Sequence, residues 1–132
     1  MTYLLDTHVW VWWNVAPERL SRKAAALLSD PEQYEELLLA SISLWELCKL
    51  LEKGRLGINA APQEWMREAL NMPKLRVSEL TPSIAYQSTV LPGSYHDDPA
   101  DQIIVATARE HEATLITKDA RMRRYPHVRA LW

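Results

Sequence analysis

The feature that most constrains this chain is an apolar run near its start that leads directly into an acid. Residues 3–5 read Tyr-Leu-Leu, and Asp6 follows at once. Because the run does not alternate with polar residues, it predicts a strand buried on both faces, as in a parallel sheet covered by helices. The bulky residues 9–13 then predict a covered helix. Asp6 is therefore expected at the carboxyl end of a central strand, where open α/β sheets place their chemistry. From this segment alone, a role of Asp6 as the N-cap of the next helix is an equal alternative to a chemical role.

Strand and helix patterns alternate through the rest of the chain. Further strands are predicted over residues 36–41, 75–80 and 114–117, with a short edge strand within 127–132. Helices are predicted over 21–29, from 43 to Gly54, over 62–70, from 82 to about 91, and after Asp98-Pro99. The pattern predicts an α/β fold in a single domain, residues 1–132, whose mainly parallel central sheet of four to five strands is flanked by helices.

Composition excludes several other classes of protein. The chain has 132 residues, 48% of them hydrophobic and 24% charged, which is typical of one folded domain and argues against disorder. Its single cysteine, Cys48, excludes an intrachain disulfide framework and a cysteine-based zinc site. The sequence shows no secretory pattern and no apolar run long enough to span a membrane. We therefore expect a soluble, cytoplasmic protein with no membrane partner.

The segment Ser43-Leu44-Trp45-Glu46 has the Ser-x-x-Glu form of a capping box. In that arrangement Ser43 would cap the helix and Glu46 would bond back to the backbone of the cap. The helix that follows is expected to end at Gly54 and to bury Leu44, Leu47, Cys48 and Leu51. Glu46 would then lie in the first turn of a helix directly after a strand, so capping and chemistry are both open for it.

Four acids occupy comparable places, because each follows an apolar segment or opens a helix near a strand end. They are Asp6, Glu46, Asp101 and Asp119. Parallel strands share one carboxyl edge, so right-handed crossovers would bring these side chains together. Close carboxylates raise one another's pKa values unless a cation neutralises them. A hard divalent ion suits such ligands, and Mg²⁺ or Mn²⁺ is favoured because no Cys/His set is present. Such a site indicates phosphodiester chemistry.

Basic residues are predicted to surround this acidic centre. Without the four acids, the 15 lysines and arginines outnumber the remaining 13 of the 17 acids, although the whole chain carries a net charge of −2. The candidates for contact with a polyanion such as RNA are Lys49, Lys118, Arg121, Arg123 and Arg124. An ordinary solvated face is the alternative for these charges.

Taken together, the motifs resemble those of PIN domains, and specifically VapC-type toxin ribonucleases of type II toxin–antitoxin pairs. The likeness rests on the order and spacing of LLDTHVWVWW, SISLWELCKLLEKGRL, HDDPADQIIVATA and TLITKDARM. It implies a parallel sheet flanked by helices, endoribonuclease activity, and Mg²⁺ or Mn²⁺ held by the acids at positions 6, 46, 101 and 119. It further implies a small antitoxin protein that blocks the site, a homodimer, and products with 5′-phosphate and 3′-hydroxyl ends.

Other polar residues near these motifs are secondary candidates. Asp98 precedes Pro99 and is expected to cap the next helix, with contact to the metal through water as the lesser role. Thr7 and Thr117 could orient carboxylates by hydrogen bonds. His8 and His96 are candidate acid–base groups that metal-dependent hydrolysis does not need.

The tryptophans of the first motif, Trp10, Trp12 and Trp13, are expected in core and interface packing rather than in stacking on RNA. The sequence thus favours a Mg²⁺- or Mn²⁺-dependent endoribonuclease that acts as a toxin. The alternative is a non-catalytic PIN-like module that binds nucleic acid or a protein partner, in which the acids only cap helices.

Overall fold

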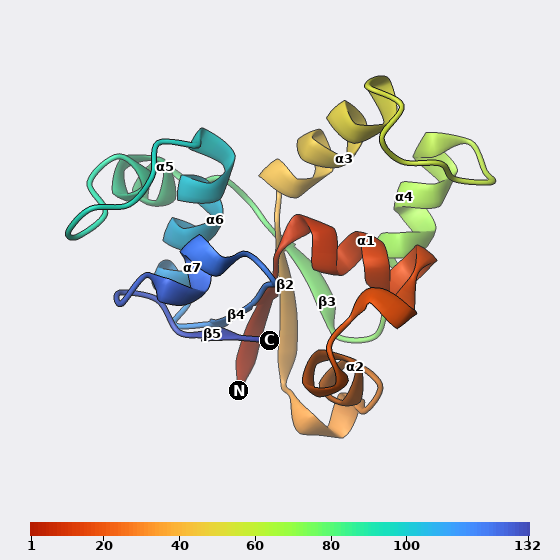
Figure 1. The fold of residues 1–132 in the computed structure, drawn as a ribbon, viewed down its shortest axis with the longest axis horizontal. Coiled ribbons are helices and arrows are strands. Elements are labelled where there is room, and N and C mark those ends of the chain that lie inside the picture. Colours follow the sequence, from red (N-terminus) through yellow and green to blue (C-terminus); the bar gives the residue numbers. More distant parts are fainter.

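A computed structural model describes residues 1–132, and its centre is a sheet of five parallel strands (Figure 1). The strands are β1 (Thr2–Leu5), β2 (Glu36–Ala40), β3 (Leu75–Ser78), β4 (Thr114–Ile116) and β5 (Ala130–Leu131), in the order β3-β2-β1-β4-β5. Every neighbouring pair is parallel. The α/β fold with a parallel sheet flanked by helices, which the sequence predicts, is therefore confirmed.

Seven α-helices connect and cover the strands. They are α1 (Thr7–Val15), α2 (Arg22–Leu28), α3 (Ile42–Glu52), α4 (Pro62–Leu70), α5 (Pro82–Ser88), α6 (Pro99–Glu110) and α7 (Ala120–Arg124). Helix α5 ends at Ser88, earlier than predicted, and the short α7 follows Asp119. Two single turns of 3₁₀ helix at Pro17–Arg19 and Pro31–Gln33 complete the elements. None of the helices is both long enough and apolar enough to cross a membrane.

The sheet is covered on both faces, which explains why its strands are continuously apolar. Tyr3 and Leu5 point into a core shared with α1, α2 and α4, whereas Leu4 points into a second core shared with α6 and α7. Figure 1 shows the two groups of helices on opposite sides of the strands. Since successive side chains of a strand alternate between faces, a strand buried on both sides needs an apolar residue at every position.

Helix α1 is anchored to the rest of the first core by Trp10. The indole is fully buried, and its Nε1–H donates to the Ala69 carbonyl at 3.0 Å. Its ring centre lies 5.5 Å from that of Trp65 on α4. Trp12 and Trp13 are half-buried and pack against the same core. The predicted packing role of these tryptophans is confirmed, while a role in an interface stays a prediction.

The predicted capping box at the start of α3 is wrong. The helix begins at Ile42, after Ser41, so Glu46 lies in the second turn rather than the first. Ser43 is buried inside the helix and bonds to another side chain. Cys48 is exposed, so the prediction that this helix buries it is wrong. Gly54 follows the helix with a φ of +68°, as the predicted end requires.

The parallel register sets the carboxyl ends of the central strands level with one another. Leu5 at the end of β1 is paired with Leu39 of β2 on one side and with Ile116 of β4 on the other. The chain order changes direction here, because β1 lies between β2 and β4. Open α/β sheets bind their ligands at such a switch point. Asp6 continues directly from β1, and its backbone N–H donates to the Ile116 carbonyl at 3.0 Å.

We predict that Trp10→Phe lowers the free energy of unfolding by roughly 2–3 kcal/mol, because a buried carbonyl loses its donor and the smaller ring leaves a cavity. Urea unfolding followed by circular dichroism measures this loss. Trp13→Phe is the matched control, since Trp13 is half-buried in the same helix and should cost below about 1 kcal/mol. Equal losses in the two variants would contradict the anchoring role of Trp10.

Candidate active site

Asp6 and Thr117 form the buried centre of the site, at the ends of β1 and β4. The Thr117 hydroxyl donates to Asp6 Oδ2 at 2.7 Å, and the Thr7 backbone N–H donates to Asp6 Oδ1 at 2.8 Å. Asp6 is only 8% exposed and Thr117 is fully buried. The Asp6 carboxylate therefore caps α1 and is also held in a fixed orientation by the neighbouring strand.

The Thr7 side chain links Asp6 to Glu46 on α3. Its hydroxyl donates to Glu46 Oε1 at 2.6 Å and lies 2.7 Å from the Ser43 hydroxyl. A threonine hydroxyl has one hydrogen to give, so Ser43 is the donor in that second contact. The chain Ser43–Thr7–Glu46 orients a carboxylate that caps no helix. The predicted role of Thr7 and Thr117 in orienting carboxylates agrees with these contacts.

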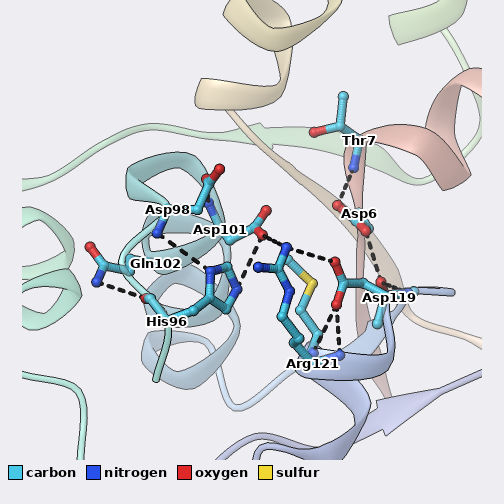
Figure 2. Close-up of polar contacts among 10 residues, drawn as sticks. Asp6, Thr7, His96, Asp98, Asp101, Gln102, Asp119 and Arg121 are labelled. Carbon is cyan, nitrogen blue, oxygen red and sulfur yellow. Dashed lines mark hydrogen bonds and ion pairs between the residues drawn. The ribbon is translucent and has the colours of Figure 1, made fainter. Parts of the chain in front are cut away.

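Asp119 lies beside Asp6, and Asp101 faces it across the Arg121 guanidinium (Figure 2). Asp119 caps α7, because its Oδ1 accepts from the backbone N–H groups of Arg121 and Met122 at 2.7 and 3.2 Å. Its own N–H donates to the Thr117 hydroxyl at 3.0 Å. The Arg121 guanidinium lies between the two acids, with Nη2 3.6 Å from both Asp101 Oδ2 and Asp119 Oδ2.

His96 and Asp98 support Asp101 at the start of α6. Asp98 Oδ1 accepts from the Asp101 N–H at 3.0 Å, which confirms that Asp98 caps this helix. His96 Nδ1 accepts from the Asp98 N–H at 3.4 Å, so a neutral ring carries its proton on Nε2. That Nε2 lies 3.2 Å from Asp101 Oδ2, but it is buried and not aligned for a hydrogen bond (Figure 2).

The electrostatics of the site show that its acids are close enough to repel one another. Burial is the first cause that raises the pKa of the Asp101 carboxyl to about 7, followed by the charges of Asp98, Asp6, Asp119 and Glu46. Burial also raises the pKa of Asp6, against the opposing effect of the Thr117 hydrogen bond. It raises the pKa of Glu46 against the hydrogen bond from Thr7.

Carboxylate and hydroxyl oxygens dominate this donor set, and such oxygens are the ligands that hard divalent cations prefer. No three His, Cys, Asp or Glu side chains converge closely enough, as they stand, to hold an ion. The Arg121 guanidinium lies where two of the carboxylates would otherwise face each other. Its side chain is 53% exposed, so it has room to turn outward.

The comparison with known protein families agrees with this arrangement. A family model described as the PIN domain matches residues 3–128. The chain belongs to the PIN-domain family. It is also similar to Ribonuclease VapC22 of Mycobacterium tuberculosis (strain ATCC 25618 / H37Rv), with 40% identity over 128 residues, 97% of this chain and 95% of that protein. The resemblance to VapC-type PIN domains that the motifs predict is thereby confirmed.

Solved structures of toxin–antitoxin complexes contain chains with the same fold. VapBC2 from Rickettsia felis, bound to a DNA fragment from its promoter, has a chain that matches with a TM-score of 0.71 and 19% identity, over 99% of this chain and 98% of that one. A toxin–antitoxin complex from Klebsiella pneumoniae gives a TM-score of 0.66 and 24% identity, over 96% of this chain and 94% of that one. At these identities the likeness shows the fold alone.

The basic residues that the sequence predicts around the acids of this PIN domain lie in different surroundings. Arg121 points into the acidic centre, and Lys49 forms an ion pair with Glu52 at 2.9 Å. Lys118 lies 5.8 Å from the Trp12 ring. Arg123 and Arg124 are exposed on α7. Contact of these five residues with RNA stays a prediction.

Sequence reasoning missed Ser43 as part of the site, because the Ser-x-x-Glu spacing also fits a capping box. It also gave Trp45 no role, although this side chain is 56% exposed next to Glu46. A signal for Trp45 was present in the sequence. Leu44, Leu47 and Leu51 already supply the apolar stripe of the helix, so a large apolar residue off this stripe is left over.

We predict that, without metal, the free energy of unfolding falls as the pH rises from about 4 to about 7. The folded protein keeps the Asp101 proton up to a pKa of about 7, whereas an unfolded chain releases it near the ordinary value of 3.8. Asp101→Asn removes the contribution of this carboxyl to the pH dependence. Solvent and Arg121 screen the charge of Asp101. The free energy of unfolding of the variant should therefore be about 1–2 kcal/mol higher than that of the natural protein near pH 8, and this difference should shrink toward pH 4.

Urea unfolding in EDTA at several pH values makes this measurement. Asp97→Asn is the matched control, because Asp97 is an exposed acid of the same segment with no hydrogen bond or ion pair. An Asp101→Asn variant that is less stable than the natural protein at pH 8 would show that the carboxylate is not under repulsion.

Proposed function

We propose that this PIN domain is a metal-dependent endoribonuclease, the toxin of a type II toxin–antitoxin pair. The proposal assigns Asp6, Glu46, Asp101 and Asp119 to the catalytic centre, with Mg²⁺ or Mn²⁺ as the cofactor. The 40% identity to Ribonuclease VapC22 supports ribonuclease activity, since the similarity extends over nearly the whole of both chains. The structures of toxin–antitoxin complexes with the same fold support a small antitoxin as the partner.

The observation that carries the proposal is that two of the acids at the site are largely buried and yet cap no helix. Asp6, Asp98 and Asp119 each cap a helix, so the capping alternative accounts for them. Glu46 and Asp101 cap nothing, and burial raises the pKa of both. Keeping such groups together lowers the stability of the fold, which indicates that they serve another purpose. Acids with strongly perturbed pKa values cluster at functional sites.

The donor set fits a hard divalent cation. Asp6, Asp101 and Asp119 would hold the ion, with Glu46 helping. An ion bound there would lower the pKa of water and neutralise the charge that develops on the phosphate. The chain's own groups prepare the site: the hydroxyls of Thr7 and Thr117 hold Glu46 and Asp6 in orientation and favour their ionised forms. Arg121 stabilises the facing carboxylates and can turn outward to a phosphate oxygen of RNA.

His8 and His96 have no required part in this chemistry. His8 is exposed beside Thr7, and His96 contacts Asp101. His96 lies where it can help to position the Asp101 carboxylate. The homodimer, the cytoplasmic location and the 5′-phosphate products that the family resemblance implies stay predictions.

We predict that Asp101→Asn abolishes cleavage of unpaired RNA in the presence of Mg²⁺ or Mn²⁺ while the protein stays folded, and that Asp6→Asn does the same. Rates should fall by at least about a hundredfold, because a neutral amide neither binds the ion as strongly nor compensates its charge. Gel analysis of an end-labelled oligoribonucleotide measures the rate. Asp97→Asn is the control and should cleave normally.

Measuring both stability and activity makes the Asp101→Asn variant decisive. Asp101→Asn is expected to be more stable than the natural protein near neutral pH and yet inactive, so its inactivity cannot come from misfolding. Full activity in this variant with metal present would refute the assignment of Asp101. A natural protein that neither cleaves RNA nor responds to metal would favour the non-catalytic binding module.

We further predict that Mn²⁺ raises the thermal stability of the protein and that Arg121→Gln tightens Mn²⁺ binding. The guanidinium and the ion compete for the same two carboxylates, and a partly exposed ion pair of this kind corresponds to about a fivefold change in affinity. Isothermal titration calorimetry measures the dissociation constant for Mn²⁺. Arg123→Gln, an exposed arginine of the same helix without an ion pair, should leave it unchanged. Weaker binding in Arg121→Gln would show that Arg121 supports the ion instead.

A further inference from the structure

Trp45 is a large aromatic side chain that the fold does not need. It lies on α3, directly before Glu46, and is 56% exposed. The leucines of the same helix already pack against the core: Leu47 is fully buried, and Leu44 and Leu51 contact the first core cluster. Because exposure of an indole to water is unfavourable, the position of Trp45 beside the acidic centre indicates that a ligand covers it.

An apolar pocket of about 450 Å³ opens on one side of Trp45, between α3 and α6, which lie next to each other (Figure 1). Its walls are Ile42, Trp45, Pro99, Ala100 and Ile103, and its acidic members are Glu46 and Asp98. Pockets with apolar walls and a few polar groups suit a flat organic ligand. Glu46 belongs both to this pocket and to the proposed catalytic centre, and the two carboxylates offer acceptors to the N–H groups of such a ligand.

Trp45 also lines a second pocket of about 290 Å³, which contains basic side chains. It shares Trp45, Glu46 and Asp98 with the first, and its basic members are Lys49, Lys53 and Arg55. Lys53 and Arg55 make no ion pair within the chain, so both are free for an anion. The ammonium of Lys49 lies 5.8 Å from the Trp45 ring centre. Trp45 therefore lines both an apolar pocket and a pocket that contains three cations.

We propose that the apolar pocket binds one unpaired nucleobase of the RNA, stacked on Trp45, while Lys53 and Arg55 contact the adjoining phosphates. This proposal rests on the proposed function, because it places the base next to the acids that would cleave the chain. An aromatic platform beside a basic groove is the arrangement by which proteins hold single-stranded nucleic acid. A base within a duplex is already stacked, so the pocket selects unpaired RNA.

Binding of an unstructured, fluorescently labelled oligoribonucleotide tests the proposal, with Asp101→Asn as the background so that no cleavage occurs. Adding Trp45→Ala should weaken binding about tenfold, since the stacked base loses its platform. Trp45→Phe should keep most of the affinity. Tyr86→Ala is the matched control, because Tyr86 is 69% exposed on α5 and lines neither pocket. A hairpin of the same composition should show no dependence on Trp45.

The phosphate contacts have their own readout. The double variant Lys53→Ala, Arg55→Ala should reduce the slope of log affinity against log salt by ~1.4, about 0.7 for each phosphate contact on a single strand. Trp45→Ala should weaken binding without changing this slope, because stacking releases no counterion. A change of slope in Trp45→Ala would mean that the tryptophan acts only by holding the cations in place.

The outcomes separate this proposal from the nuclease assignment. If the natural protein cleaves RNA and Trp45→Ala binds it as tightly as before, the base pocket is wrong and the nuclease assignment stands. If RNA binding depends on Trp45 but no cleavage occurs, the base pocket stands and the nuclease assignment fails. Unchanged RNA affinity with lost antitoxin binding in Trp45→Ala would assign the surface to a protein partner and overturn the proposal.

Discussion

The arrangement of the site depends on the hydrogen bond from the Thr117 hydroxyl to Asp6, which joins positions 111 residues apart. It connects the carboxyl ends of β1 and β4, and it is possible because the parallel register sets Leu5 level with Ile116. The same hydroxyl accepts from the Asp119 N–H, so one side chain fixes acids from two segments of the chain. Thr7 has the equivalent role toward α3, since it holds Glu46 while its own N–H binds Asp6.

The hydrogen bonds from these hydroxyls only partly offset the unfavourable burial of the carboxylates. The pKa of Asp6 and Glu46 stays raised although each accepts a short hydrogen bond, because burial outweighs the donor in both cases. Asp101 has no such donor, and burial together with the neighbouring charges raises the pKa of its carboxyl to about 7. A protein selected for stability alone would replace such an acid with a neutral side chain. Under the proposed function, this retained repulsion would favour the binding of a cation.

The sequence predicted the strands and the acid that directly follows β1 because both depend on short-range patterns, whereas the sharing of one ion by four acids stays a prediction. An apolar run that stops at an acid identifies a buried strand and its carboxyl end, and the order of such runs indicates a parallel sheet. The failures arise where two structures share one pattern. Ser43 and Glu46 have the spacing of a capping box, but Ser41 already adopts helical backbone angles and the helix begins earlier. Nothing local to Ser43 shows that Thr7, 36 residues away, offers it a partner. For the same reason Arg121 was expected on a basic rim, although its neighbours in space are acids.

The position of Arg121 links the two kinds of binding that we propose. While its guanidinium lies between Asp101 and Asp119, the charge of the acidic centre is partly neutralised. Under the proposed function, an ion bound by these carboxylates would remove the attraction that keeps Arg121 inward, and its 53% exposed side chain could then face a phosphate of RNA. Occupation of the acidic centre would thus add a positive charge to the side that faces RNA, while Lys53 and Arg55 stay available throughout. Because linkage is reciprocal, RNA that holds Arg121 outward would in turn strengthen binding of the ion.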